Sequence, residues 1–151
     1  MPSPFEASAG QIENLDRANM YRDLAGLPRL VPHRALNLAA QNHADYAAAH
    51  NEGHSETYGQ SGFTGAQPGD RCRYTGYAFS SFEVMAFGGG SRTSPGWGVD
   101  MWIGSVYHRL PFMSYRSTQV GAGVSGTTMR TVGMNFGSFG AGAPAERLLA
   151  T

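Results

Sequence analysis

The chain has 151 residues, a length that fits one domain able to bury its own core. Its 11 arginines balance 11 acidic residues, lysine is absent, and only 15% of the residues are charged. This balance, with no basic stripe, argues against nucleic acid as a partner. No apolar run approaches the about 20 residues of a membrane-spanning helix, and the N-terminus shows no basic-then-apolar leader. We therefore expect a cytosolic protein or a mature or trimmed exported form.

Two helical patterns occupy the first fifty residues. The first runs from Ile12 and is ended by Gly26 and Pro28. The second is expected to open at residues 31–32, where a proline suits the first turn of a helix. Its stripe of mostly small side chains should pack closely against a sheet or another helix, and it contains Leu36, Ala40, His43 and Ala47. A histidine on such a stripe is interpreted as a core residue with satisfied hydrogen bonds rather than as a metal ligand.

The rest of the chain mixes loops, helices and strands. A polar loop after the second helix carries His54 and Glu56, and loops of this length are usually functional or mobile. The pattern then predicts a short helix at 67–73, a strand at 77–87, a helix at 99–108 ended by Pro111, and paired strands at 119–124 and 129–136. This order predicts an α+β layered domain rather than a βαβ repeat. We place it at residues 12–137, between a flexible N-terminal segment, 1–11, and a flexible tail, 138–151.

Two polar residues in apolar surroundings are the first candidates for a shared site. Glu83 lies in an otherwise apolar run, and His108 follows an aromatic-rich helical pattern. A carboxylate in such a run is costly unless it is paired, hydrogen-bonded or bound to an ion. The lone Cys72 cannot form an internal disulfide, and we interpret it as a small buried thiol.

Several short pieces of the chain together resemble one known family. In their order and spacing they are similar to the bacterial branch of the CAP superfamily, which comprises cysteine-rich secretory, antigen-five and pathogenesis-related proteins. The pieces are Asn19, Arg22, Gly26-Leu27-Pro28, Ala39-Ala40-Gln41, His43-Ala44, Tyr46, His54, Phe63-Thr64-Gly65, Asp70-Arg71, Gly76-Tyr77, Glu83-Val84, Ser105, His108-Arg109 and Val120-Gly121-Ala122-Gly123-Val124.

The resemblance implies a CAP-like α-β-α sandwich, with a central antiparallel sheet of three to four strands between helical layers, and usually export from the cell. It also implies a cleft where two histidines and two acids meet, sometimes holding zinc or another divalent ion. His54 would be the first histidine, Glu83 the first acid and His108 the second histidine. The second acid has no clear match, and Glu56 and Asp100 are both candidates.

Two departures from the family pattern bear on this cleft. Glu83 lies between Phe82 and Val84 instead of the usual Gly and Asn, and the disulfides of eukaryotic members are missing. If His54 and His108 converge, they could bind zinc with water in the open position. In the other interpretation, Glu83 hydrogen-bonds one of these histidines directly and holds the sandwich together without a metal. Residue spacing leaves both open.

The sequence contains no evident activated nucleophile. Ser105, three residues before His108 on one helix face, is kept among the cleft residues, but this pairing is more often incidental in helices. Aromatic residues gather in or near the loops that should flank the cleft, and such rims suit apolar ligands, sugars or peptides. They are Tyr58, Phe63, Trp97, Trp102, Tyr107, Phe112 and Tyr115, with Trp102 the first choice for the core.

Three hypotheses for function follow. The first is an extracellular or cell-surface CAP-type domain that binds a small apolar, lipid, glycan or peptide ligand in a His/Glu cleft, with or without a divalent metal and without turnover; the resemblance links CAP proteins to sterols and fatty acids. The second is a metal-assisted hydrolase of peptide or cell-wall bonds that uses His54, Glu83 and His108. The third is a non-catalytic structural module of a larger secreted protein.

Overall fold

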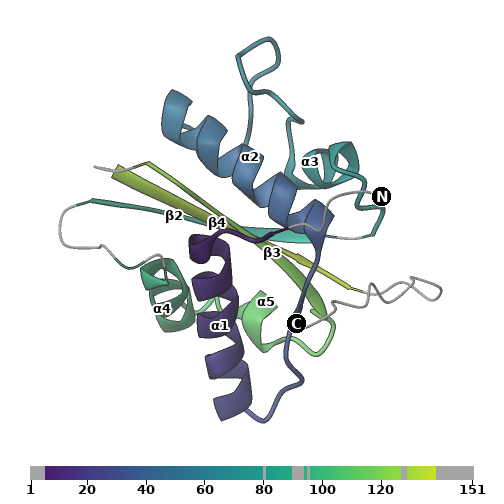
Figure 1. Ribbon diagram of the computed structural model, residues 1–151, viewed down its shortest axis with the longest axis vertical. Coiled ribbons are helices and arrows are strands. Elements are labelled where there is room, and N and C mark those ends of the chain that lie inside the picture. The colour runs from purple at the N-terminus through teal and green to yellow at the C-terminus, as the bar shows by residue number, and fades with distance from the viewer. Residues whose placement is uncertain (1–5, 80, 90–93, 95, 127–128, 139–151) are drawn as a thin grey trace.

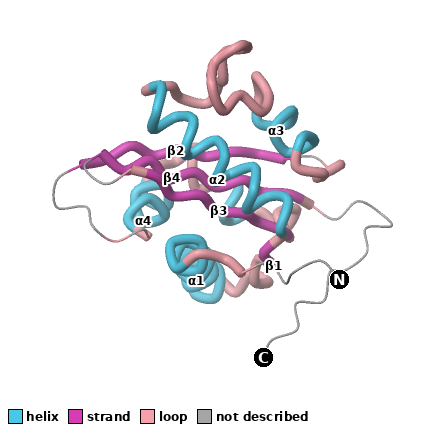
Figure 2. The backbone as a smooth tube through the Cα atoms, turned by 45° about the horizontal axis from the view of Figure 1, so that its top comes forward, coloured by secondary structure: helices cyan, strands magenta, loops and turns pink. Residues whose placement is uncertain are grey.

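The structure is a computed structural model that describes residues 6–79, 81–89, 94, 96–126 and 129–138. A four-stranded sheet lies between two helical layers, with α2 and α3 on one face and α1, α4 and α5 on the other (Figures 1 and 2). The elements are α1 (Ala9–Leu24), β1 (Val31–Pro32), α2 (Arg34–His50), α3 (Pro68–Tyr74), β2 (Ser81–Gly89), α4 (Trp97–Gly104), α5 (Leu110–Met113), β3 (Gln119–Ser125) and β4 (Met129–Gly137). The α+β sandwich expected from the sequence is confirmed.

The sheet is mixed rather than wholly antiparallel. Its strand order is β1-β3-β4-β2, in which β2, β4 and β3 pair antiparallel and β1 pairs parallel with β3. The prediction that residues 31–32 open a helix was wrong. The N–H of Val31 donates to the carbonyl of Thr118, just before β3, and the N–H of His33 donates to the carbonyl of Val120 in β3, both at 2.9 Å. The helix begins only at Arg34, after this short strand.

The observed helix ends differ from those predicted by hydrophobic periodicity where local hydrogen bonds or backbone geometry set the end. Helix α1 begins at Ala9, because Ser8 and Gln11 form a reciprocal capping box that an apolar pattern does not reveal. The helix predicted at 99–108 ends at Gly104, since Ser105 is extended (φ −99°, ψ 134°). Pro111, expected to end a helix, instead lies in the first turn of α5.

The larger core lies between the sheet and the layer of α1, α4 and α5. Alternate residues of β2, β3 and β4 point into it, and they pack against Trp102 of α4 and Phe112 of α5, which are fully buried. The position of Trp102 in the core is as predicted. The smaller core lies under α2 and α3 and contains Cys72, also buried as predicted.

Helix α2 lies unusually close to the sheet. A side chain at Gly121 or Gly123 of β3 would overlap the backbone of α2 at Leu36 or Ala40. The predicted stripe of α2 is buried, His43 included. This close contact fixes the position of α2 over the strands, and so brings His43 towards the polar face of β2.

Candidate functional site

The site forms where β2 faces α2 and α3. Successive side chains of a strand point to opposite faces, so Val84 enters the larger core while Glu83 faces the layer of α2 and α3. The Glu83 carboxylate is 2% exposed. Its oxygens accept from Arg71 Nη2 at 2.8 and 2.9 Å, and Oε1 also accepts from His54 Nδ1 at 3.0 Å. The costly carboxylate of the apolar run is thus paired.

Arg71, on α3, occupies the centre of the site. Its side chain is fully buried, and its Nη2 also donates to the carbonyl of His54 at 2.9 Å. Its Nη1 donates to the carbonyls of Gly65 and Ala66 at 3.2 and 3.4 Å. One guanidinium therefore ties the long loop before α3 to the carboxylate of β2.

Glu56 and His43 form the second half of the site. Both side chains are fully buried, and His43 Nδ1 donates to Glu56 Oε1 at 2.8 Å. His43 Nε2 faces the carbonyl of Gly53 at 2.9 Å. Both ring nitrogens therefore lie within hydrogen-bond distance of an oxygen. The interpretation of His43 as a satisfied core histidine is confirmed.

The four buried groups pair basic with acidic side chains. Arg71 and His43 face two carboxylates, Glu56 and Glu83; Arg71 Nε lies 3.7 Å from Glu56 Oε1, and His43 Nε2 lies 3.7 Å from Glu83 Oε1. Glu56 also accepts from the backbone N–H of Thr64 at 2.6 Å. We call the side chains of His43, Glu56, Arg71 and Glu83 the buried charge network. Each member thus has a partner of the opposite type, as buried ionisable groups need, while Arg71 Nε has no hydrogen-bond partner among the described residues.

Electrostatics keep Glu83 ionised. Burial alone would raise the pKa of its carboxyl, but the hydrogen bond from His54 and the charges of Arg71 and His43 outweigh burial and hold the pKa below its ordinary value. A further donor is available in Asn135, whose side-chain amide, assigned with its nitrogen towards β2, lies 3.2 Å from Glu83 Oε2. A carboxylate so engaged is a weak base.

His54 is the exposed edge of this arrangement. Its side chain is 51% exposed, whereas the four members of the buried charge network are at most 2% exposed. Of its two ring nitrogens, only Nδ1 hydrogen-bonds to another of the described residues. A ligand that reaches this site therefore meets His54 first.

The other predicted cleft residues form no hydrogen bond or ion pair with this group among the described residues. His108 Nδ1 is 2.9 Å from the Ser105 hydroxyl, and within the described residues no hydrogen bond or ion pair joins His108 to His54 or Glu83. Asp100, on α4, accepts from Tyr21 at 3.0 Å and pairs with Arg17 at 3.4 Å in the opposite helical layer. Of the two candidates for the second acid, Glu56 is the one near Glu83.

The described side chains around Glu83 are not arranged as a metal site. Among the residues that the structure describes, no group of three or more His, Cys, Asp or Glu side chains is arranged to hold an ion. His54 Nδ1 and both nitrogens of His43 already face oxygens. As placed, the side chains do not form a ligand set, and the zinc interpretation stays a prediction.

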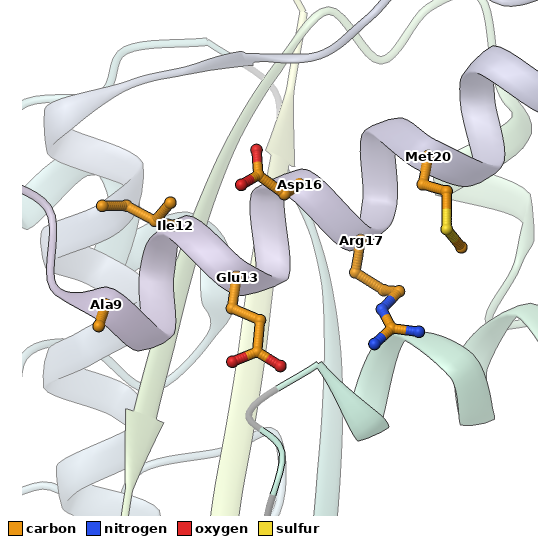
Figure 3. A pocket seen from close by; sticks show the side chains of 6 residues that line it. All are labelled: Ala9, Ile12, Glu13, Asp16, Arg17 and Met20. Atoms are coloured by element: carbon orange, nitrogen blue, oxygen red, sulfur yellow. The ribbon is translucent and has the colours of Figure 1, made fainter.

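An open hollow lies away from the buried charge network. It is an open depression of about 630 Å³ along α1 (Figure 3). Its walls are Ala9, Ile12, Glu13, Asp16, Arg17 and Met20. These residues come from one helix, in the layer opposite α2 and α3, so the hollow contributes nothing to the His54 site.

Sequence reasoning missed the role of Arg71. It appeared only as part of a short piece shared with a family, and no periodic pattern marks it. The signal that could have found it is charge balance, because a buried Glu83 requires a buried cation. Asn135 likewise gave no signal, since its partner lies across the β2–β4 pairing, where Glu83 is opposite Asn135.

Comparison with known proteins gives one family. The model described as CAP, the cysteine-rich secretory protein family, matches residues 15–136. The comparison with curated proteins gave no match. None of the described helices is both long and apolar enough to cross a bilayer.

Three solved bacterial structures share the fold. An extracellular protein of Bacillus anthracis with an SCP domain has a TM-score of 0.68 at 20% identity, and the match covers 86% of this chain and 40% of that one. An outer surface protein of Borrelia burgdorferi has a TM-score of 0.68 at 17% identity, with 82% and 88% covered. A cysteine-rich secretory protein of Staphylococcus aureus has a TM-score of 0.63 at 16% identity, with 86% and 38% covered. This chain thus spans well under half the length of the first and third proteins.

Proposed function

The chain belongs to the cysteine-rich secretory protein (CAP) family, and we propose that it acts as a binding domain that recognises a glycan or peptide through His54 without turnover. We further propose that it works outside the cell or at the cell surface. Two of the similar solved structures, an extracellular protein and an outer surface protein, support that location.

The observation that carries this proposal is that the four side chains of the buried charge network pair with one another. Each of its four ionisable side chains already has a partner of the opposite type, and the half-exposed ring of His54 is the group left at its edge. An imidazole with one free nitrogen can donate to or accept from a hydroxyl or a peptide group. Rigid support from Glu83 lowers the entropy lost when His54 binds such a group.

A metal-assisted hydrolase is the alternative, and it would require the same residues to give up their present contacts. Glu83 would have to leave Arg71 to act as a base, which would leave a buried guanidinium without its charge partner. His108 would have to leave Ser105 and approach His54. These costs favour binding over turnover.

The test is a binding and turnover assay with the whole chain. Histidine side-chain NMR signals are followed while peptidoglycan disaccharides and short peptides are added, with and without zinc. We expect the His54 signal to shift with at least one ligand, no product to form, and His54→Ala to weaken binding by at least tenfold.

His108→Ala is the matched variant, because this histidine is exposed and lies outside the network. It should bind as the wild type does. Zinc-dependent product formation that both substitutions abolish would replace the proposal by the hydrolase. Failure of every tested glycan and peptide to shift the His54 signal would remove it.

A further inference from the structure

A second surface of the molecule exposes several large apolar side chains within one short segment. It is formed by residues 105–116, between α4 and β3, and we call it the 105–116 surface. Its exposed fractions are 61% for Val106, 79% for Tyr107, 59% for Leu110 and 72% for Tyr115. A clustered apolar exposure of this kind marks an interaction site.

Adjacent to it lies a shallow apolar hollow. Leu110 and Pro111 form part of its wall, together with Phe82 of β2, which is also exposed. The hollow measures about 280 Å³. The apolar surface therefore continues from α5 onto the outermost strand of the sheet.

The fold holds this segment in place, so its exposure is not that of a frayed loop. Phe112 is fully buried in the larger core. The buried Arg22 of α1 donates to the carbonyls of Phe112 and Ser114 at 2.7 and 3.0 Å. Backbone hydrogen bonds from Arg109 to Ser105 and from Met113 to Arg109 close its turns at 3.1 Å. With its inner side anchored, the outward side chains are held towards solvent.

The charge on this surface has one sign. Arg109 and Arg116 are both exposed, and no ion pair to either occurs among the described residues. The sequence contains no Asp or Glu between Asp100 and Glu146. The surface therefore complements an anionic partner and offers no acidic group to neutralise its own arginines.

We propose that the 105–116 surface binds the face of an anionic lipid bilayer. Tyrosine and arginine suit the level of the headgroups, because each joins an apolar body to a polar end. Val106 and Leu110 would enter the boundary with the acyl chains, while Arg109 and Arg116 meet lipid phosphates. An acidic protein segment is the competing occupant. The proposal is independent of ligand binding at His54.

The experiment is flotation of the whole chain with lipid vesicles. Vesicles of equal parts phosphatidylglycerol and phosphatidylcholine are compared with vesicles of phosphatidylcholine alone, at low and high salt. We expect binding to the anionic vesicles only, and weaker binding at high salt because exposed charges are screened. Soluble polyglutamate is the competing probe, measured by fluorescence anisotropy.

Substitutions separate the contribution of the arginine charges from that of the apolar side chains. Arg109→Gln with Arg116→Gln should weaken vesicle binding about twenty-five-fold, from about fivefold per arginine, and Tyr107→Ser with Leu110→Ser should weaken it at least tenfold. The matched control is Leu24→Ser with Tyr74→Ser, two apolar residues exposed elsewhere on the molecule.

The control pair should bind vesicles as the wild type does, and so should His54→Ala, which separates this proposal from the proposed function. Three results would overturn the inference: equal binding to both kinds of vesicle, tighter binding to polyglutamate than to vesicles, or an equal loss in the control pair. Failure of the chain to float with either vesicle would also overturn it.

Discussion

The guanidinium of Arg71 lies between two buried carboxylates, Glu83 and Glu56. It contacts Glu83 through hydrogen bonds and Glu56 at 3.7 Å, with no exposed surface of its own. Removing one partner of a buried ion pair leaves an uncompensated charge, which is a larger cost than the pair's own net contribution. The stability of the site thus depends on this residue more than on either histidine.

Arg71→Met should therefore lower the free energy of unfolding by about 3–5 kcal/mol, as measured by urea denaturation near neutral pH. Arg73→Met is the matched control. Arg73 lies two residues away on α3 and pairs with Asp70 through a side chain that is 68% exposed. A solvent-screened pair of this kind contributes about 0–1 kcal/mol, so equal losses in the two variants would contradict a buried role for Arg71.

At the scale of elements, the packing of α2 on β3 places His43 over the polar face of the sheet. Gly123 permits this approach, because the backbone of Ala40 occupies the space that a side chain would need. Amide side chains of α2 then form hydrogen bonds with backbone groups at the free edge of β3. Gln41 accepts from the N–H of Val124 at 3.1 Å and donates to the carbonyl of the same residue at 3.0 Å.

Gly123→Ala should cost about 3 kcal/mol of unfolding free energy, near the upper end for overpacked sites, since the added methyl group must move α2 away from the sheet. Gly104→Ala, at the end of α4 with open space around it, should be neutral or stabilise the chain by about 0.5 kcal/mol. Thermal unfolding of both variants measures the contrast. A neutral effect at Gly123 would mean that α2 does not lie this close.

Gln41→Ala should cost about 2 kcal/mol, because both backbone groups of Val124 lose their partner. The Val124 amide should also exchange with deuterium faster than the amides of β4, which keep their strand partners. Asn42→Ala changes the next residue of α2 and is expected to stay within about 0.5 kcal/mol of the wild type. Unchanged exchange at Val124 would count against this edge contact.

At the scale of the whole molecule, the sequence predicts the layers and the strands but not the partners across them. Periodicity locates the buried stripe of α2, and the apolar run around Glu83 shows that the carboxylate needs a partner. It cannot reveal that Arg71 supplies the charge, because the two residues meet only when α3 packs on β2. Family resemblance grouped His108 with His54, whereas in the described residues His108 contacts Ser105. The capping box of α1 and the extended residues 31–32 depend on hydrogen bonds that hydrophobic patterns do not contain.

The central claim is that Glu83 is a permanently ionised part of the fold rather than a proton carrier. Its folded pKa lies below the ordinary value of 4.5, so the ionised carboxylate stabilises the folded chain above that pH. This stabilisation is lost as the pH falls through the folded pKa. A carboxyl with a raised pKa would behave in the opposite way, and acidification would stabilise the folded chain.

The free energy of unfolding, measured from about pH 7 to about pH 3, decides between a lowered and a raised pKa of Glu83. It is measured for the wild type, for Glu83→Gln and for the exposed control Glu6→Gln. We predict that the wild type and the control lose stability together on acidification. Glu83→Gln should be less stable at neutral pH and should show a flatter acid dependence. A wild type that gains stability over this range, with the gain absent in Glu83→Gln, would contradict the account.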